Sequence, residues 1–364
     1  MLFIREILMK LTLLLPAMLL TACASMPIGY EPIDEMPETD LSVPSVTAKV
    51  ETASVDSSGD AADDPAIWID PRDASSSLVL GTDKQAGLYS YDLAGNVVQF
   101  IPSGALNNVD LRQRVTVGGW LGDLAAATNR TDNSVTLFTI KGGEMTEMGR
   151  FPAARKEPYG FCMGYQDENV LMVVTHKNGE VDLFRLDAFG EPAQATLLQT
   201  VKMESQLEGC VFDEPNAALY VGEENAGITR YDLDPSAEMP LTGGRRIDVL
   251  GSDTGIVADI EGLAIYRQGE TGGYLIASSQ GNNTYAVYKL EDGAYLGRFS
   301  IGTDEATGID GAEETDGIEA SSAALPGYPK GVFLVQDGFN MPEGSTQNYK
   351  YVDWRDIEAA LDLE

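Results

Sequence analysis

Short apolar runs with polar ends recur along most of the chain at a regular spacing. One motif is seen as "AGLYSYDL", "NSVTLFTI", "GEVDLFRL", "AGITRYDL" and "NTYAVYKL", with its aromatic residue at Tyr91, Phe138, Phe184, Tyr231 and Tyr288. These aromatics lie 47, 46, 47 and 57 residues apart, and "QNYKYVDW" near Tyr351 is a weaker sixth copy. Each run has the length and the turn-forming borders of a β-strand.

Two further series precede the aromatic one, always in the same order. The nearer series is apolar with a polar end, as in "SLVLGTDK", "DLAAATNR" and "VLMVVTHK". The farther series is rich in small residues and begins near residues 63, 107, 157, 207, 260 and 315. Three strands in each unit match the blade of a β-propeller. The six units therefore predict an all-β fold, a six-bladed β-propeller, with the farther series as the innermost strands.

The N-terminus has the pattern of an export signal. Two basic residues, Arg5 and Lys10, precede the apolar run "LTLLLPAMLL", which is too short for a stable spanning helix. The following "LTAC" resembles the lipobox of bacterial lipoproteins. We therefore expect residues 1–22 to be a signal peptide and Cys23 to be lipidated; an ordinary signal peptide is the alternative.

The segment after the signal divides into a tether and a domain. Residues 23–50 contain prolines and acids without an apolar period, which is typical of a flexible tether. Residues 51–364 then form the propeller domain. Because Ala24 follows Cys23, we expect a lipid anchor in the outer membrane of a Gram-negative bacterium, with a periplasmic or secreted protein as the alternative.

The net charge disfavours two classes of binding partner, and the cysteine content allows one internal disulfide. The formal net charge of −33 disfavours nucleic acid and anionic lipid surfaces, which would be repelled. We expect a monomer. Besides Cys23, the chain has Cys162 and Cys210, which in an exported protein could form a disulfide or stay as buried thiols.

Acidic residues recur where the innermost strands begin. Equivalent positions of a propeller lie at one height around its axis, so these residues form a ring: Asp64, Asn108, Tyr159, Glu208, Glu261 and Asp316. Carboxylates this close repel one another and call for a cation. Oxygen ligands select a hard ion such as Ca²⁺, and a single histidine, His176, disfavours a zinc site.

Basic residues recur at the ends of the second strands. Lys84, Arg130 and Lys177 occupy neighbouring positions on three consecutive blades. They could form salt bridges with the acid ring, or they could hold phosphate groups, with Arg binding in a bidentate manner and Lys as point charges.

At this point the motifs resemble those of the β-propeller phytases. "DAADDPAIW", "NNVDLR", "EPYGF", "DIEGLAIY", "SSQGNNTYAVY", "TDGIE" and "QDGFN" occur in the family's order over about residues 55–355. The resemblance implies calcium-dependent hydrolysis of phytate (myo-inositol hexakisphosphate), or of its calcium complex, with several bound Ca²⁺ ions. Some ions would stabilise the fold, and others would activate a water at the channel mouth.

The resemblance also implies a role for each matching residue. The expected metal ligands are Asp63, Asp64, Glu208, Glu223 or Glu224, Asp259, Glu261 and Asp310. The expected catalytic residues are Lys84, Arg130, Tyr159, Lys177 and Glu208. The expected substrate-binding residues are Lys84, Arg130, Tyr159, Lys177 and Asp316. Asp60 and Asn108 would serve a structural calcium or hold the strand starts. Gln85 departs from the family, which commonly has a second lysine there.

Two other functions fit the same fold. A lactonase-like calcium propeller enzyme would need the acid ring but not the three clustered cations. A non-catalytic propeller with structural calcium would bind a partner on its upper face.

Overall fold

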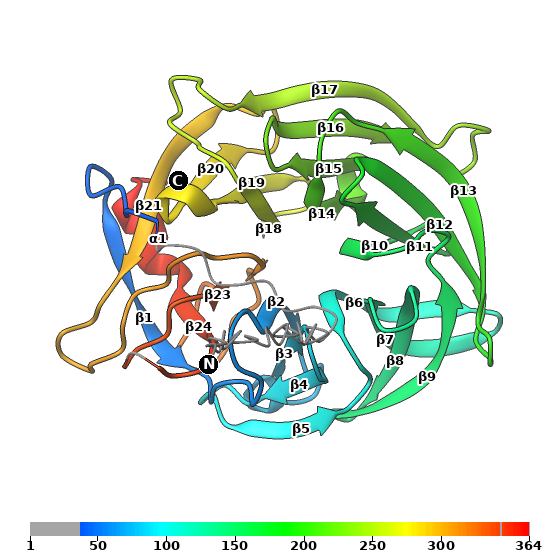
Figure 1. Ribbon diagram of the computed structural model, residues 1–364, viewed down its shortest axis with the longest axis horizontal. Helices are drawn as coiled ribbons and strands as arrows, with labels where there is room; N and C mark the ends of the chain where they lie inside the picture. The colour runs from blue at the N-terminus through cyan, green and yellow to red at the C-terminus, as the bar shows by residue number, and fades with distance from the viewer. Residues whose placement is uncertain (1–36, 343, 364) are drawn as a thin grey trace, which may run out of the picture.

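The computed structural model describes residues 37–342 and 344–363, and its fold is a β-propeller. Four antiparallel sheets of four strands and one sheet of eight strands surround a common centre (Figure 1). Each four-stranded sheet runs in chain order from an inner strand to an outer one. The predicted signal peptide, Cys23 and the first half of the tether lie outside the described residues. Within the described part, no helix is long and apolar enough to cross a membrane.

The four-stranded sheets follow one another along the chain. The first contains β2 (Ala62–Trp68), β3 (Leu78–Asp83), β4 (Gly87–Tyr91) and β5 (Val97–Ile101). The second contains β6 (Leu106–Val117), β7 (Trp120–Asn129), β8 (Ser134–Lys141) and β9 (Glu144–Pro152). The third contains β10 (Pro158–Gln166), β11 (Asn169–His176), β12 (Glu180–Ala188) and β13 (Gln194–Lys202). The fourth contains β14 (Leu207–Asp213), β15 (Ala218–Glu223), β16 (Gly227–Leu233) and β17 (Leu241–Val249).

The eight-stranded sheet joins the last strands to the first. Its order is β18-β19-β20-β21-β1-β24-β23-β22. Its bounds are β18 (Ile260–Gln268), β19 (Gly272–Ser279), β20 (Thr284–Lys289), β21 (Tyr295–Gly302), β1 (Ser45–Glu51), β24 (Asn348–Asp353), β23 (Val332–Asp337) and β22 (Ile318–Ser321). Short helices complete the fold: η1 (Ala74–Ser76), η2 (Glu214–Asn216), η3 (Gln280–Asn282) and α1 (Trp354–Ala360).

The three predicted strand series are confirmed. The repeat aromatics lie on the third strand of each unit, in β4, β8, β12, β16, β20 and β24, and the small-residue series forms the inner strands. The core fills the space between neighbouring sheets. Leu137 and Phe151 of the second sheet, for example, share one buried cluster with Met172 and Phe184 of the third. The prediction of an all-β propeller is thus confirmed.

The N-terminal strand closes the ring. β1 pairs antiparallel with β24, where Val50 lies opposite Tyr351, and parallel with β21, where Ser45 lies opposite Ser300. The domain therefore begins earlier than the predicted boundary at residue 51, because backbone pairing holds Ser45–Glu51 in the sheet. Asp40 also lies against the domain, where it forms an ion pair with Arg298 at 2.8 Å.

The two internal cysteines form a disulfide. Cys162 in β10 is bonded to Cys210 in β14, with their Cα atoms 5.7 Å apart. Both are buried in one apolar cluster between the third and fourth sheets. The bond therefore links the inner strands of two sheets that share no strand pairing.

Candidate active site

The inner strands break register at the same place in five repeats. Two residues are skipped by the pairing with the second strand each time, as in a β-bulge. The skipped residues are Asp63 and Asp64, Asn107 and Asn108, Tyr159 and Gly160, Glu208 and Gly209, and Glu261 and Gly262. Bulges redirect side chains, and here they aim the predicted site residues at the channel mouth.

Glycine at the second bulge position lets neighbouring inner strands approach closely. A Cβ on Gly160 would lie 1.9 Å from the carbonyl oxygen of Glu208. A Cβ on Gly209 would lie 2.1 Å from the carbonyl oxygen of Glu261. Backbone contact between sheets thus sets the spacing of the acidic side chains, and no other residue fits there without a shift.

Three glutamates converge at the mouth. Carboxylate oxygens of Glu208, Glu224 and Glu261 lie within 4.8 Å of one another, and all three side chains are buried. Burial raises the pKa of Glu208. Burial and then Glu208 raise the pKa of both Glu224 and Glu261. The cluster is costly as it stands, because buried like charges repel and lose their hydration.

These glutamates also have free acceptor atoms. Among the described residues, no group donates a hydrogen bond to Glu208 Oε2, Glu224 Oε1 or Glu261 Oε2. Buried polar atoms are nearly always paired. A hard cation would satisfy three carboxylate oxygens at once, and oxygen ligands at this spacing suit Ca²⁺. The residues therefore fit the calcium that the sequence predicts.

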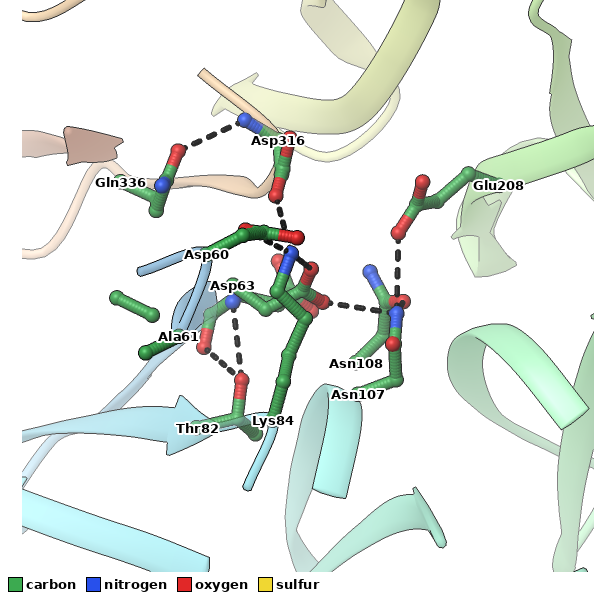
Figure 2. A network of polar contacts seen from close by, with 12 residues as sticks. Asp60, Ala61, Asp63, Thr82, Lys84, Asn107, Asn108, Glu208, Asp316 and Gln336 are labelled. Carbon is green, nitrogen blue, oxygen red and sulfur yellow. Dashed lines mark hydrogen bonds and ion pairs between the residues drawn. The ribbon is translucent and has the colours of Figure 1, made fainter. Parts of the chain in front are cut away.

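Lys84 lies beside this cluster and is surrounded by acids. Figure 2 shows its Nζ directed at Asp60, Asp63 and Asp316, at 2.6, 3.2 and 2.8 Å. Burial alone would lower the pKa of Lys84, but its neighbours, Asp316 foremost, hold that pKa well above the usual value. Burial raises the pKa of Asp63 to about 6, although Lys84 opposes the shift.

Asn107 joins the two halves of the mouth. Its Nδ2 donates to Asp63 Oδ2 at 3.0 Å and to Glu208 Oε1 at 3.1 Å (Figure 2). Its neighbour Asn108, which the sequence predicts at this mouth, also faces the acids, with its amide nitrogen 3.3 Å from Glu208 Oε1. The asparagine pair at the start of the second inner strand was the signal that could have identified Asn107 as well.

The other predicted basic and aromatic residues lie at the same mouth. Lys177 Nζ is 4.3 Å from the centroid of the Tyr159 ring, a cation–π contact, and its charge opposes the rise in the pKa of Glu224. Burial and then Glu208 raise the pKa of the Tyr159 phenol well above its usual value. The charge of Arg130 acts on Asp63.

Asp259 and Gln280 complete the rim. Burial raises the pKa of Asp259, whose charge reaches Glu224. The Nε2 atom of Gln280 donates to Asp316 Oδ1 at 2.7 Å. The sequence analysis gave no role to Gln280. Its place just after the second strand of its repeat, equivalent to that of Lys84 after β3, was the signal.

Three predicted metal ligands have other surroundings. Asp64 turns into the channel, where its Oδ2 accepts from the Val109 amide at 3.0 Å. Glu223 forms an ion pair with Arg246 and accepts from the backbone of Glu204 and Ser205.

Asp310 forms an ion pair with Lys350 at the edge of a separate cavity of about 400 Å³. Glu224, not its neighbour Glu223, reaches the cluster, because successive residues at a strand end point in opposite directions and Glu223 faces Arg246.

Solved structures resemble the fold only distantly. A functionally unknown protein from Desulfotomaculum acetoxidans DSM 771 aligns with a TM-score of 0.45 and 16% identity, over 64% of this chain and 70% of that one. The Cps50 (Swd1) beta-propeller domain of Myceliophteria thermophila aligns with a TM-score of 0.45 and 10% identity, over 79% of this chain and 82% of that one.

Sequence comparison is more specific. The 3-phytase of Bacillus subtilis (strain 168) is 37% identical over 333 residues, which covers 87% of this chain and 85% of that protein. The model of the Phytase family matches residues 9–364. The resemblance drawn from the motifs is therefore confirmed, and the chain belongs to the Phytase family.

Proposed function

We propose that this protein hydrolyses phosphate monoesters of phytate at the channel mouth. The observation that carries the proposal is the meeting of two sets of groups in one place. Glu208, Glu224 and Glu261 have buried oxygens without donors, and basic side chains from three consecutive sheets lie beside them. Family membership and the similarity to a 3-phytase support the same reaction.

Calcium is the cofactor we propose for this mouth. Glu208, Glu224 and Glu261 would hold it, with Asp63 and Asp259 at the edge of the same cluster. Bound there, the ion would lower the pKa of a coordinated water and neutralise charge on phosphoryl oxygens. An ion would also make a polyanionic substrate tolerable to a protein with a net charge of −33.

The chain's own residues bind and orient the phosphate. Lys177 supplies positive charge beside Tyr159, and Arg130 supplies it within reach of Asp63. The phenol of Tyr159 stays protonated because burial raises its pKa, so it donates a hydrogen bond to a phosphate oxygen. Lys84 forms ion pairs with Asp63 and Asp316, and Asn107, which donates to Asp63 and Glu208, fixes the orientation of Glu208.

The experiment is phosphate release from phytate by the chain from residue 37 onward, after chelation and after Ca²⁺ is restored. We expect activity to disappear on chelation and to return with Ca²⁺. A folded protein that releases no phosphate under either condition would exclude the proposal. In that case, hydrolysis of a lactone would indicate the lactonase-like enzyme. Binding of a ligand without phosphate groups, with no turnover, would indicate the non-catalytic binding propeller.

We also propose that the propeller has six blades. β18 to β21 have the strand order of one blade, and β22, β23, β24 and β1 have that of another. Among the described residues, the strand pairing that joins the two is the parallel pairing of three residues of β1 with β21. Two blades in this sheet and one in each of the four others make six.

For localisation we propose export with a lipid on Cys23, anchorage in an outer membrane and a monomeric state. "LTAC" followed by Ala24 supports the lipid anchor and its sorting. Labelling with a radioactive fatty acid tests the proposal. We expect label on the wild type and none on Cys23→Ser, while label on neither would contradict it.

A further inference from the structure

The disulfide follows two residues of the mouth, Tyr159 and Glu208, closely along their strands. Cys162 is three residues after Tyr159 on β10, and Cys210 is two residues after Glu208 on β14. In β14 the register break ends at Cys210 itself, and in β10 it ends at Phe161, one residue before Cys162. The covalent bond thus begins where each bulge ends.

The third and fourth sheets, which the disulfide joins, have another close contact at the same height, from β11 to β14. Thr175 Oγ1 donates to the carbonyl oxygen of Glu208 at 2.8 Å, and Gly160 leaves no room for a side chain against that carbonyl. Other neighbouring inner-strand starts are tied by backbone hydrogen bonds, Gly262 to Asp316 at 2.7 Å and Gly317 to Asp63 at 3.0 Å, or by a hydroxyl, as where Thr128 Oγ1 donates to the Tyr159 carbonyl oxygen at 2.7 Å. Between the third and fourth sheets, the Thr175 hydroxyl bond from β11 to β14 is joined by a covalent bond from β10 to β14.

Repulsion from neighbouring carboxylates tends to displace Glu208, so a restraint on its strand affects its position. Its carboxylate is buried beside Glu224 and Glu261, and the three repel one another when no cation neutralises them. The repulsion favours any backbone movement that withdraws Glu208 from the group. A fixed strand start prevents that movement and keeps the ligand oxygens at the spacing that a cation requires.

We propose that the Cys162–Cys210 disulfide is a positioning element of the active site, which holds Glu208 of β14 against Tyr159 of β10 before a cation binds. The inference rests on the proposed function in taking Glu208 as a calcium ligand. The bond lies outside the reacting groups and acts through the backbone of β14. It therefore affects calcium binding and turnover more than the affinity for phytate.

The test compares the wild type with the double variants Cys162→Ala/Cys210→Ala and Cys162→Val/Cys210→Ala, at a temperature where all are folded. Ca²⁺ is titrated calorimetrically into chelator-treated protein, and kcat and KM for phytate are measured at saturating Ca²⁺. We expect Ca²⁺ to bind the variants about tenfold more weakly, the usual size of a lost supporting contact. We expect kcat to fall and KM to change little.

A purely structural disulfide gives a different result. The melting temperature would fall while the Ca²⁺ titration and kcat stayed as in the wild type, and that outcome would overturn the inference. Ile357→Ala, a cavity variant in α1, is the matched control: it should lower the melting temperature without moving the titration. If the double variants do not fold, the wild type reduced in the folded state provides the same comparison with every side chain retained.

The calorimetric readout also keeps the two proposals separate. If the oxidised wild type binds Ca²⁺ but releases no phosphate from phytate, the proposed function fails, while the positioning role is still decided by the titration. If it releases phosphate and the variants match it in Ca²⁺ affinity and kcat, only the positioning role fails.

Discussion

Lys84, predicted as a phosphate contact, lies in a buried group of carboxylates. Its side chain is 6% exposed and lies among three carboxylates. Removal of one member of a buried ionic group leaves the others uncompensated. The charge of Lys84 therefore stabilises the folded mouth in addition to any contact with a bound phosphate. Arg130 is partly exposed, so its removal leaves no buried charge uncompensated.

We predict that Lys84→Ala and Arg130→Ala both reduce phytate hydrolysis, by roughly 100-fold or more if each stabilises transition-state charge. Only Lys84→Ala should also lower the free energy of unfolding substantially, by about 3–5 kcal/mol. Urea denaturation of chelated protein and phosphate release measure the two effects. Lys49→Ala, which removes a surface ion pair with Asp356, is the control and should change neither. Equal stability losses for Lys84→Ala and Arg130→Ala would contradict the assignment.

Glu319, deeper in the channel, is an acidic residue whose ionised form is disfavoured by its surroundings. Glu319 lies beside a small cavity with Asp64 and Asp110. Burial and then Asp110 raise the pKa of Glu319 to about 8, while Arg112 opposes the shift and Glu214 adds to it. Since the folded pKa exceeds the unfolded value, the protonated side chain contributes stability at low pH, and this contribution is lost as the pH rises toward 8.

We predict that Glu319→Gln stabilises the chelated protein more at pH 9 than at pH 5.5, by about 1 kcal/mol or more. The amide resembles the neutral acid, so it avoids the cost of ionisation that the wild type bears at high pH. Denaturant unfolding at the two pH values measures the difference. A gain that does not depend on pH would show that Glu319 ionises freely in the folded protein.

At the scale of the element, the bulged inner strand is the unit that makes the site. Five of the repeats use the same device, a two-residue register break, to point a different side chain into the mouth. The second residue of the break is glycine in three repeats, because the next inner strand approaches there. In the first two repeats Asp64 and Asn108 take this position.

We predict that Gly209→Ala destabilises the protein by about 1–3 kcal/mol, as overpacked positions do, and reduces activity at saturating Ca²⁺. The new Cβ would meet the Glu261 carbonyl oxygen at 2.1 Å, so β14 and β18 must separate and carry Glu208 and Glu261 apart. Gly222→Ala is a graded control, since its Cβ would lie 3.3 Å from the same oxygen. Equal effects of the two substitutions on thermal unfolding and kcat would contradict this explanation.

At the scale of the whole molecule, closure of the ring depends on a strand from the opposite end of the chain. β1 joins β24 to β21, and α1 packs against the same region in Figure 1. Loss of β1 would expose the edges of both neighbours and leave the last blade without an outer strand. A domain cut at residue 51, where the sequence places the boundary, would lack this strand.

We predict that a chain beginning at residue 37 unfolds cooperatively, whereas one beginning at residue 52 has a markedly lower melting temperature or aggregates. Calorimetry and gel filtration of the two chains make the comparison. If both unfold at the same temperature, β1 does not close the propeller in solution. Addition of a peptide with the sequence of residues 37–51 to the shorter chain should restore part of the lost stability.

The sequence by itself determined the repeat, the identity of the three strand series and the family. Period and strand patterning are local properties, so six copies of three registers predict a propeller without any knowledge of contacts. The convergence of Glu208, Glu261 and Lys84 followed from the same symmetry, because equivalent positions of a ring lie at one height.

Only the tertiary structure decided which atoms meet. It selected Glu224 over Glu223 and placed Asn107 beside Asn108 against the acids, because the direction of a side chain at a bulge depends on a register that composition does not encode. It separated Asp64 and Asp310 from the cluster and paired Cys162 with Cys210. It also brought residues 45–51 to the far end of the chain, a long-range pairing that no local pattern signals.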